Sequence, residues 1–419
     1  MDTKECTRRG FFGRVLFVVV VVTALASFGT GIRWGLPQAI NTETIQPWAL
    51  DAIAPIAPLN EAYHGFTRGG NEFVVYPLLH YVVLSGAYAP YMAVKYFKGS
   101  FTSPSSTYPY GVEDIVEFCE DLTIIARLVS LVMALGILFC VYRITVMVAE
   151  PIAAFWATLC CALIAPLSFY AKTSNLDVPY AFWILLAGWQ FLLALERYKT
   201  RHFVLLGVFA ALAVATKDQA YGFFLLVPLV LAYRMSVDRP DGDTQPLPLR
   251  IGALFSLPML SGGLAAVMTY ALANNLLFGG FDGWVRHLTF GSELFDYREA
   301  NETPFYTVDA QVSLLAKSLV IVLQSVGPVS LGLMIAGVVI ATRECNSRLL
   351  ALLALPTSYY LFVIAVFSIV FSRYLLVPLI LLTPFAGVAI SRMLSLQGAR
   401  LTLAMVVVAT AFATQIALV

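Results

Sequence analysis

The chain has 419 residues, of which 59% are hydrophobic and only 12% are charged. A soluble domain would carry about a quarter charged residues, so this composition predicts a multi-pass integral membrane protein. The net charge is +1, which gives no reason to expect a nucleic-acid partner.

The first apolar run follows a basic N-terminal segment. Such a segment is also typical of a cleaved signal peptide, but the later runs insert without a separate leader, so we expect a retained first helix. A spanning helix needs about 20 apolar residues. Eleven candidate runs occur, at 12–30, 122–142, 151–170, 178–195, 203–216, 219–234, 251–273, 313–341, 349–370, 374–391 and 401–418. The sequence therefore predicts an all-α polytopic protein with about eleven transmembrane helices.

Basic residues are distributed unequally between the two sides of these runs. With the N-terminus in the cytoplasm, nearly all basic residues of the short loops fall on the inner side, as the positive-inside rule requires. Only Lys172, Lys217 and Arg373 fall in short outer loops. We therefore expect a cytoplasmic N-terminus and look for a function of these three cations.

Two long loops, 31–122 and 274–312, fall on the extracytoplasmic side of one integral domain that covers residues 1–419. The run 73–97 inside the first loop is apolar but broken by Pro77 and Pro90, so we expect it at the outer interface. The apolar runs hold almost no ionisable groups, which counts against an ion-coupled carrier.

Two carboxylates of the first long loop are candidates for a general base. Asp51 follows Trp48, and Glu43 lies eight residues earlier. A carboxylate just above the lipid headgroups could take a proton from an incoming hydroxyl. The alternative is that Asp51 only caps a helix.

The short outer loop at 172–179 carries a second polar cluster. Asn175 or Asp177 would suit a helix cap, and Pro179 the first turn of the helix that follows. Capping leaves open a role for the Asp177 carboxylate, with Lys172 five residues before it, in holding a sugar hydroxyl, a phosphate or a divalent metal ion.

Lys217 and Arg373 each stand at an outer helix end, where a cation is often only a membrane anchor. Both would also lie at the depth of a lipid phosphate, and an arginine fork matches phosphate oxygens. His80 and His287 are the two outer histidines worth testing. No zinc spacing, nucleotide-binding loop or nucleophile-elbow motif occurs, so we expect neither a dedicated zinc site nor a bound nucleotide.

In order and spacing the chain resembles the C-type glycosyltransferases that use polyprenyl-phosphate sugars. It is most similar to the superfamily of protein O-mannosyltransferases and lipid A aminoarabinose transferases. The likeness is carried by Gly35-Leu36-Pro37, an outer-loop carboxylate, Tyr76-Pro77 with His80-Tyr81, Asn175-Leu176-Asp177-Val178-Pro179, Thr216-Lys217, and Arg373-Tyr374-Leu375 with Pro378.

The resemblance implies an inverting transfer of a sugar from a polyprenyl-phosphate donor to a hydroxyl of a protein, lipid or glycan on the extracytoplasmic side. Members of the family usually carry an Asp-Glu pair in the first outer loop. Here Thr42-Glu43 keeps only the Glu and Asp51-Ala52 only the Asp. We prefer Asp51 as the base and keep Glu43 as the alternative.

The resemblance also assigns roles to other residues. Arg373, Lys217 and Lys172 are predicted to bind the donor phosphate. Residues predicted to contact substrate are Tyr76, His80, Tyr81, Asn175, Asp177 and His287. No cofactor is expected apart from a divalent metal ion as an open alternative at Asp177. A lipid-linked-sugar carrier and an inactive subunit of the same fold are the competing functions, and a bacterial or archaeal plasma membrane is the expected location.

Overall fold

The structure is a computed structural model. It describes residues 3–38, 47, 49, 51–67, 76–101, 103, 105, 111–237, 252–279, 281–282, 284–289 and 307–419. These residues are almost entirely helical, and the only β-type pairing among them is one isolated bridge between Phe101 and Val112. The predicted all-α class is confirmed.

The helices follow one another with short connections. The N-terminal half contains α1 (Thr3–Gly29), α2 (Ala57–Thr67), α3 (Leu79–Phe97), α4 (Ile115–Val148), α5 (Pro151–Ala162), α6 (Ala165–Tyr170), α7 (Asp177–Arg197), α8 (Thr200–Thr216), the 3₁₀ helix η1 (Asp218–Phe223) and α9 (Val227–Val237). The C-terminal half contains η2 (Ala253–Phe255), α11 (Leu257–Ala273), α12 (Leu276–Gly279), α14 (Val308–Val326), α15 (Pro328–Arg343), α16 (Ser347–Ala351), α17 (Ala354–Tyr359), the π-helical turn η3 (Tyr360–Ile364), α18 (Ala365–Phe367), α19 (Ser372–Leu394) and α20 (Ala399–Leu418).

Six helical stretches are long and apolar enough to cross a membrane, and further apolar helices are shorter. The six are α4, α7, α14, the stretch 347–367, α19 and α20. Of these, α7 and α19 are mostly buried inside the bundle, whereas α14 and α20 expose most of their surface. An integral membrane protein is therefore supported by both composition and structure.

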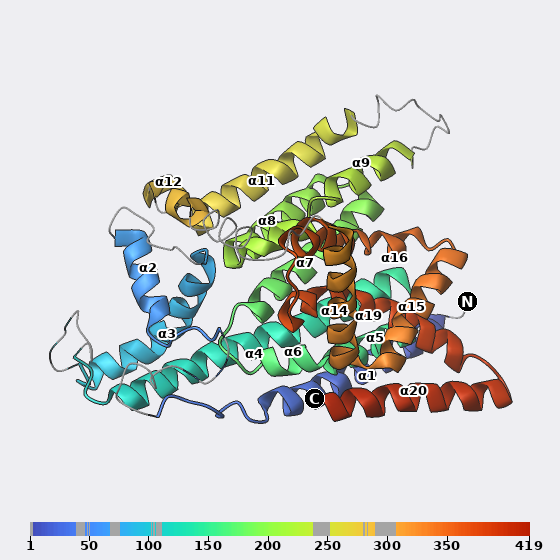
Figure 1. Ribbon diagram of the computed structural model, residues 1–419, viewed down its shortest axis with the longest axis horizontal. Helices are drawn as coiled ribbons and strands as arrows, with labels where there is room; N and C mark the ends of the chain where they lie inside the picture. The colour runs from blue at the N-terminus through green and yellow to red at the C-terminus, as the bar shows by residue number, and fades with distance from the viewer. Residues whose placement is uncertain are drawn as a thin grey trace.

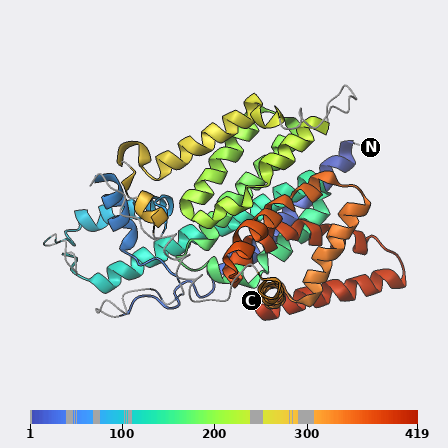
Figure 2. The ribbon, with the colours of Figure 1, turned by 45° about the horizontal axis from the view of Figure 1, so that its top comes forward.

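The run 313–341, which the sequence presents as a single span, is instead two helices. Gly327 between α14 and α15 has φ +76°, a left-handed conformation that glycine adopts without strain, and Pro328 then starts α15. Helix α14 lies across the bundle, roughly perpendicular to α4 and α20 (Figure 1), and is seen nearly end-on in Figure 2. The apolar run was correct, but its continuity was not.

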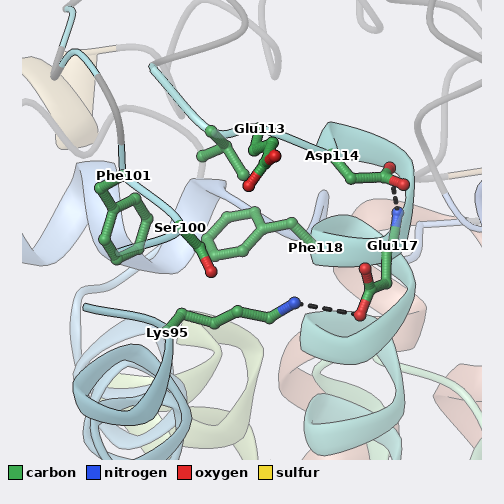
Figure 3. Close-up of a pocket in the computed structure, with 8 residues that line it drawn as sticks. Lys95, Ser100, Phe101, Glu113, Asp114, Glu117 and Phe118 are labelled. Carbon is green, nitrogen blue, oxygen red and sulfur yellow. Dashed lines mark hydrogen bonds and ion pairs between the residues drawn. The ribbon is translucent and has the colours of Figure 1, made fainter. Parts of the chain in front are cut away.

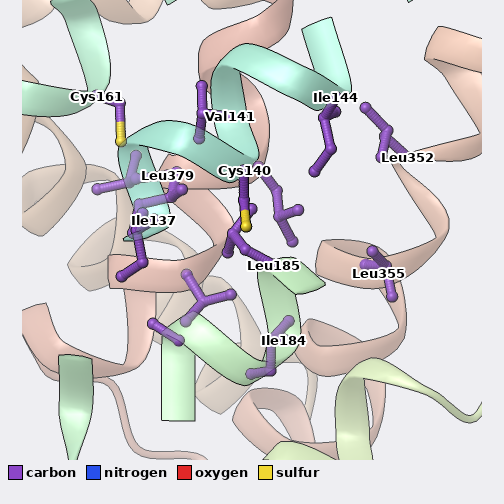
Figure 4. Close-up of a cluster of buried hydrophobic side chains, with 14 of the residues drawn as sticks. Ile137, Cys140, Val141, Ile144, Cys161, Ile184, Leu185, Leu352, Leu355 and Leu379 are labelled. Carbon is purple, nitrogen blue, oxygen red and sulfur yellow. The ribbon is translucent and has the colours of Figure 1, made fainter. Parts of the chain in front are cut away.

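The core of the bundle lies where α4, α5, α7 and α19 meet. Figure 4 shows side chains from these helices gathered around Cys140, with Leu352 and Leu355 completing one side. Helices approach closely where glycine removes the side chain: a Cβ at Gly207 of α8 would lie 2.1 Å from the Gly262 carbonyl oxygen of α11. Close backbone approach through small residues is the usual way in which membrane helices pack.

A small outer lobe has its own apolar core. Helices α2 and α3 pack together beside the N-terminal part of α4 (Figure 1). Their buried residues, including Leu84 and Tyr88, join Ile53 from the preceding segment and Leu176 from the loop before α7. The lobe thus packs directly against the loop that carries Asp177.

Two adjacent asparagines at the end of α11 tie this lobe to the bundle. Asn274 accepts a hydrogen bond from the backbone N–H of Leu78 at 3.0 Å, and Asn275 donates from Nδ2 to the carbonyl of Gly65 at 2.7 Å. Both asparagines are buried. The first long loop is therefore held against the start of the second.

The opposite end of the bundle gathers the residues that the sequence places on the inner side. Arg348 pairs with Glu196 at 3.3 Å, and Arg392 pairs with Glu344 at 2.9 Å. Ser391 also donates to Glu150 at 2.7 Å. The predicted inner loops therefore meet at one end of the bundle, consistent with the alternation of crossings read from the sequence.

Candidate functional site

The centre of the candidate site is a buried ion pair between two consecutive helices. Asp177 begins α7 and Lys217 follows the last residue of α8, so the connectivity brings both to the same end of the bundle. Lys217 Nζ lies 2.7 Å from Asp177 Oδ1, and the two residues are 5% and 2% exposed. Asn175 Nδ2 donates to Asp177 Oδ2 at 3.1 Å, so both carboxylate oxygens are engaged.

A second ion pair lies at this end, between Arg373 and Asp51. Arg373 stands in the first turn of α19, and Asp51 belongs to the first long loop. The Arg373 side chain is 18% exposed and that of Asp51 is 36% exposed. Arg373 Nε is buried and has no hydrogen-bond partner among the described residues. The guanidinium thus keeps one donor uncommitted.

One aromatic ring lies between the two cations. The Tyr374 ring centre is 5.8 Å from Lys217 Nζ and 5.6 Å from Arg373 Cζ. Tyr180 adds a second ring 5.2 Å from Lys217 Nζ, and its hydroxyl donates to the Arg373 carbonyl at 3.5 Å. Aromatic faces attract cations at these distances and also exclude water, which strengthens the electrostatic field of both positive groups.

A third pair extends the site to the second long loop. His287, in the helical residues 284–289, lies 2.9 Å from Asp218 through its Nε2. Asp218 directly follows Lys217, so this contact brings residues of the second long loop beside the central pair.

Tyr76 lies within the electrostatic reach of this cluster. Burial, together with the negative charges of Asp177 and Asp218, raises the pKa of Tyr76 to about 12. The phenol therefore stays protonated throughout the physiological pH range and can act as a hydrogen-bond donor. Of the aromatic residues that the sequence assigned to substrate, Tyr76 is the one that the structure brings to the site.

The segment that carries Asp51 is fastened to the loop before α7. Ile53 N–H donates to the Ser174 carbonyl at 3.0 Å, and Ser174 Oγ donates to the Ile53 carbonyl at 3.4 Å. Asp51 itself has φ +56°, in the left-handed region that is uncommon for residues other than glycine. This local geometry places the carboxylate two residues from a fixed point beside Asn175 and Asp177.

Other predicted site residues lie elsewhere. Lys172 lines a separate pocket with Arg127 and Trp34, described below. His80 is only 1% exposed, and neither ring nitrogen has a hydrogen-bond partner among the described residues. Tyr81 packs against the core of the outer lobe.

Two residues of the first long loop that entered the sequence argument cannot be placed. Glu43 and Trp48 lie outside the described residues. The competition between Asp51 and Glu43 for the role of base therefore stays a prediction.

The structure adds residues to which the sequence had assigned no role. Tyr180 and Tyr374 contact the cations, and Asp218 holds His287. Both tyrosines follow motif residues directly, Pro179 and Arg373, which was the available signal. Arg127 was detectable as an isolated arginine inside an apolar run, a pattern that usually marks a special site.

The metal alternative at Asp177 fits poorly with the observed contacts. Both oxygens of its carboxylate are occupied by Lys217 and Asn175. In the part of the chain that the structure describes, no group of three or more His, Cys, Asp or Glu side chains could hold a metal ion. A metal at this position would require Asp177 to release Lys217.

A polar cavity of about 390 Å³ lies away from this site, at the N-terminal end of α4. Figure 3 shows that its acidic groups already have structural partners. Asp114 accepts hydrogen bonds from the N–H groups of Val116 and Glu117 and so caps α4, while Glu117 pairs with Lys95 at 3.0 Å. These contacts account for the charged residues without a ligand.

The sequence matches no protein-family model, and it matches no curated protein. The structure, however, is similar to solved structures of the oligosaccharyltransferase from Archaeoglobus fulgidus. A form tethered to an acceptor peptide with the NVT sequon gives a TM-score of 0.54 at 13% identity, covering 97% of this chain and 55% of the other. Archaeal oligosaccharyltransferase AglB in complex with an inhibitory peptide and a dolichol-phosphate gives 0.54 at 14% identity, covering 98% and 55%.

A third form of the same enzyme, in complex with Zn and sulfate, gives a TM-score of 0.52 at 14% identity and covers 96% of this chain. The chain thus spans about half the length of the proteins it matches. At such low identity the likeness establishes the fold alone. The resemblance drawn from the sequence is confirmed at that level: the chain has the fold of a C-type glycosyltransferase.

Proposed function

We propose that the protein is a membrane glycosyltransferase that moves a sugar from a polyprenyl-phosphate donor to a hydroxyl acceptor. The observation that carries the proposal is the pair of cations, Lys217 and Arg373, that share the Tyr374 ring at one end of a C-type glycosyltransferase fold. The oligosaccharyltransferase complex with a dolichol-phosphate supports a lipid-linked donor as a class.

In the proposed reaction the acceptor oxygen attacks the anomeric carbon of the sugar. The bond between that carbon and the phosphate oxygen breaks, and the polyprenyl phosphate leaves with the electron pair. Positive groups in a site shielded from water stabilise the charge that grows on the phosphate. Arg373 suits this role best, because its guanidinium is partly accessible and its Nε is uncommitted.

Asp51 is the proposed base that accepts the proton of the acceptor hydroxyl. Its pairing with Arg373 represents the resting state, in which the guanidinium occupies the carboxylate. A donor phosphate competes for the same guanidinium and would leave the carboxylate to the acceptor. Base catalysis of this kind typically contributes about 10²–10⁴-fold to the rate.

Asp177 acts differently in this proposal. Because it is buried and bound by both Lys217 and Asn175, it holds the lysine in place. Lys217 supplies positive potential to the phosphate site, and Tyr76 offers a phenolic proton to the donor sugar or the acceptor. His287 fixes the second long loop through Asp218.

The test is transfer from radiolabelled polyprenyl-phosphate sugars to a pool of protein, lipid and glycan acceptors by the purified protein. Asp51→Asn should lose about 10²-fold or more of its rate, while Asp282→Asn, which alters an exposed acid of the second long loop, should keep it. Equal transfer by wild type and Asp51→Asn would exclude Asp51, and Glu43→Gln would then be the variant that loses activity if Glu43 is the base.

Donor binding is measured separately. Arg373→Ala should weaken binding of the polyprenyl-phosphate donor, and Arg373→Lys should restore part of it, because a lysine keeps the charge but not the fork. Unchanged affinity in Arg373→Ala would remove its phosphate role. Movement of the donor between vesicle leaflets with no transfer to any acceptor would identify the protein as a carrier.

A further inference from the structure

A pocket of about 310 Å³ lies beside the outer ends of α1 and α6, separate from the three ion pairs. Its lining combines two cations with two aromatic rings and small groups: Gly31, Trp34, Arg127, Phe169, Lys172 and Thr173. No acidic residue is among them. The pocket is at the small end of the size range of ligand sites, about 300–1,000 Å³.

Arg127 forms the inner wall of this pocket. The residue is 2% exposed, and its Nη1 donates to the carbonyls of Ile32 and Trp34 at 2.6 Å each. No carboxylate among the described residues pairs with it, and its Nε is buried without a partner there. A buried guanidinium compensated only by carbonyl dipoles keeps a strong positive potential in the space next to it.

Lys172 brings a second positive charge to the same pocket. The side chain is partly buried, and no hydrogen bond or ion pair joins it to a described residue. Arg33, which is exposed, lies between the two residues whose carbonyls bind Arg127. Three cations thus lie close to one pocket that contains no acid.

The aromatic residues of the pocket indicate its depth. Trp34 and Phe169 are 55% and 41% exposed, in segments that directly follow or end helices of the bundle. Aromatic residues with exposed rings are typical of the boundary between lipid tails and headgroups, where tryptophan is enriched. A ligand here would have its charged group at headgroup level and its apolar part in the bilayer.

We propose that this pocket binds the phosphodiester headgroup of an anionic membrane phospholipid, with Lys172 contacting the phosphate and Trp34 and Phe169 packing beside the glycerol and upper acyl chains. Arg127 supplies positive potential from behind and fixes the segment 32–35. The site is distinct from the donor site at Lys217 and Arg373, and it does not depend on the proposed transfer reaction. It gives Lys172 a role in binding a resident lipid.

The test uses the full chain in mild detergent with phosphatidylglycerol as the probe and phosphatidylcholine as the neutral comparison. Native mass spectrometry should show one phosphatidylglycerol retained by wild type. Lys172→Ala should weaken its binding about fivefold, the effect of about one cation at a charged lipid surface. Lys172→Arg should restore binding, and Lys98→Ala, which removes an exposed lysine at the end of α3, should leave it unchanged.

Equal losses in Lys172→Ala and Lys98→Ala would overturn the proposal, because they would show only general attraction to a charged surface. Equal retention of the two lipids would overturn it as well. Inorganic phosphate at millimolar concentration should not displace the lipid; displacement would identify a site for free phosphate and contradict the lipid assignment.

A second measurement does not depend on removing a charge. Phosphatidylglycerol with brominated acyl chains should quench tryptophan fluorescence more than brominated phosphatidylcholine does. The difference should vanish in Trp34→Phe, which keeps an aromatic ring but removes the fluorophore. An unchanged difference in Trp34→Phe would place the bound lipid elsewhere and refute the site.

Discussion

Lys217 and Asp177 show how a buried pair can serve a site without touching substrate. Removing one member of such a pair leaves an uncompensated charge and typically costs about 3–5 kcal/mol of stability. We therefore expect Lys217→Met to lower the thermal denaturation midpoint strongly.

The double variant Lys217→Met/Asp177→Leu should recover most of that loss, because neither charge then remains buried alone. Thermal denaturation in detergent of the wild type, both single variants and the double variant gives the coupling between the two residues. Additive losses would show that the two side chains do not stabilise each other.

His80 gives a pH-dependent prediction. Burial in α3 lowers the pKa of His80 from 6.5 to about 3. The unfolded chain binds the proton first as pH falls, so the stability that His80 allows is complete above pH 6.5 and is lost as pH decreases toward 3. The slope from this single group is about 1.4 kcal/mol per pH unit inside that window.

Because both ring nitrogens lack described partners, His80→Leu should cost little stability at pH 7. It should also remove that part of the acid sensitivity. Chemical denaturation at a series of pH values between 3 and 7 measures both effects. A large loss at pH 7 would instead show that the imidazole makes a contact essential to the fold.

Residue chemistry was predictable where it depended on topology. The unequal distribution of lysine and arginine identified Lys217 and Arg373, and the structure places both beside Tyr374. The separate location of Lys172 was not predictable, because five residues of loop separate it from Asp177 and the direction of a short loop depends on packing. The pairing of Asp51 with Arg373 joins residues far apart in sequence and leaves no local signal.

At the scale of elements, the sequence predicted helices wherever apolar runs were long. It missed the break at Gly327, because one glycine within an apolar run is compatible with a continuous helix and only its φ of +76° shows the corner. It also placed the start of the second crossing at 122, whereas α4 begins at Ile115 with Asp114 as its cap. Polar residues at a helix start resemble a loop when only hydropathy is considered.

The contact of α8 with α11 depends on the absence of side chains. Gly207→Val should separate the two helices, since even a Cβ would lie 2.1 Å from a backbone oxygen that cannot move independently. Gly263→Val in α11, where a Cβ would meet nothing within 4 Å, is the matched control. Thermal stability in detergent should fall for the first variant only. Similar midpoints would show that the helices tolerate a wider spacing.

At the scale of the whole molecule, the two ends of the bundle differ in chemistry. The ion pairs Asp177–Lys217, Asp51–Arg373 and Asp218–His287 lie at one end, and those of Glu196 and Glu344 lie at the other. This separation agrees with an orientation in which the first set is extracytoplasmic.

Cys345 provides a test of that orientation, because it is exposed and follows Glu344 directly. In a Cys6→Ser background, a membrane-impermeant maleimide should fail to label Cys345 in intact cells and should label it after lysis. Lys98→Cys should be labelled in both cases. Labelling of Cys345 from outside would invert the orientation.

The 34 residues of α4 run without a break from the outer lobe into the bundle. At 1.5 Å per residue the helix is about 51 Å long, whereas the hydrocarbon core of a bilayer is about 30 Å thick. One helix therefore acts as a ruler that sets how far the lobe stands from the lipid. Removing seven residues, two turns, would bring the lobe about 10 Å closer and turn it by only about 20°. The reach of the protein toward an acceptor could thus be adjusted by helix length alone, without altering the groups at Asp177 and Lys217.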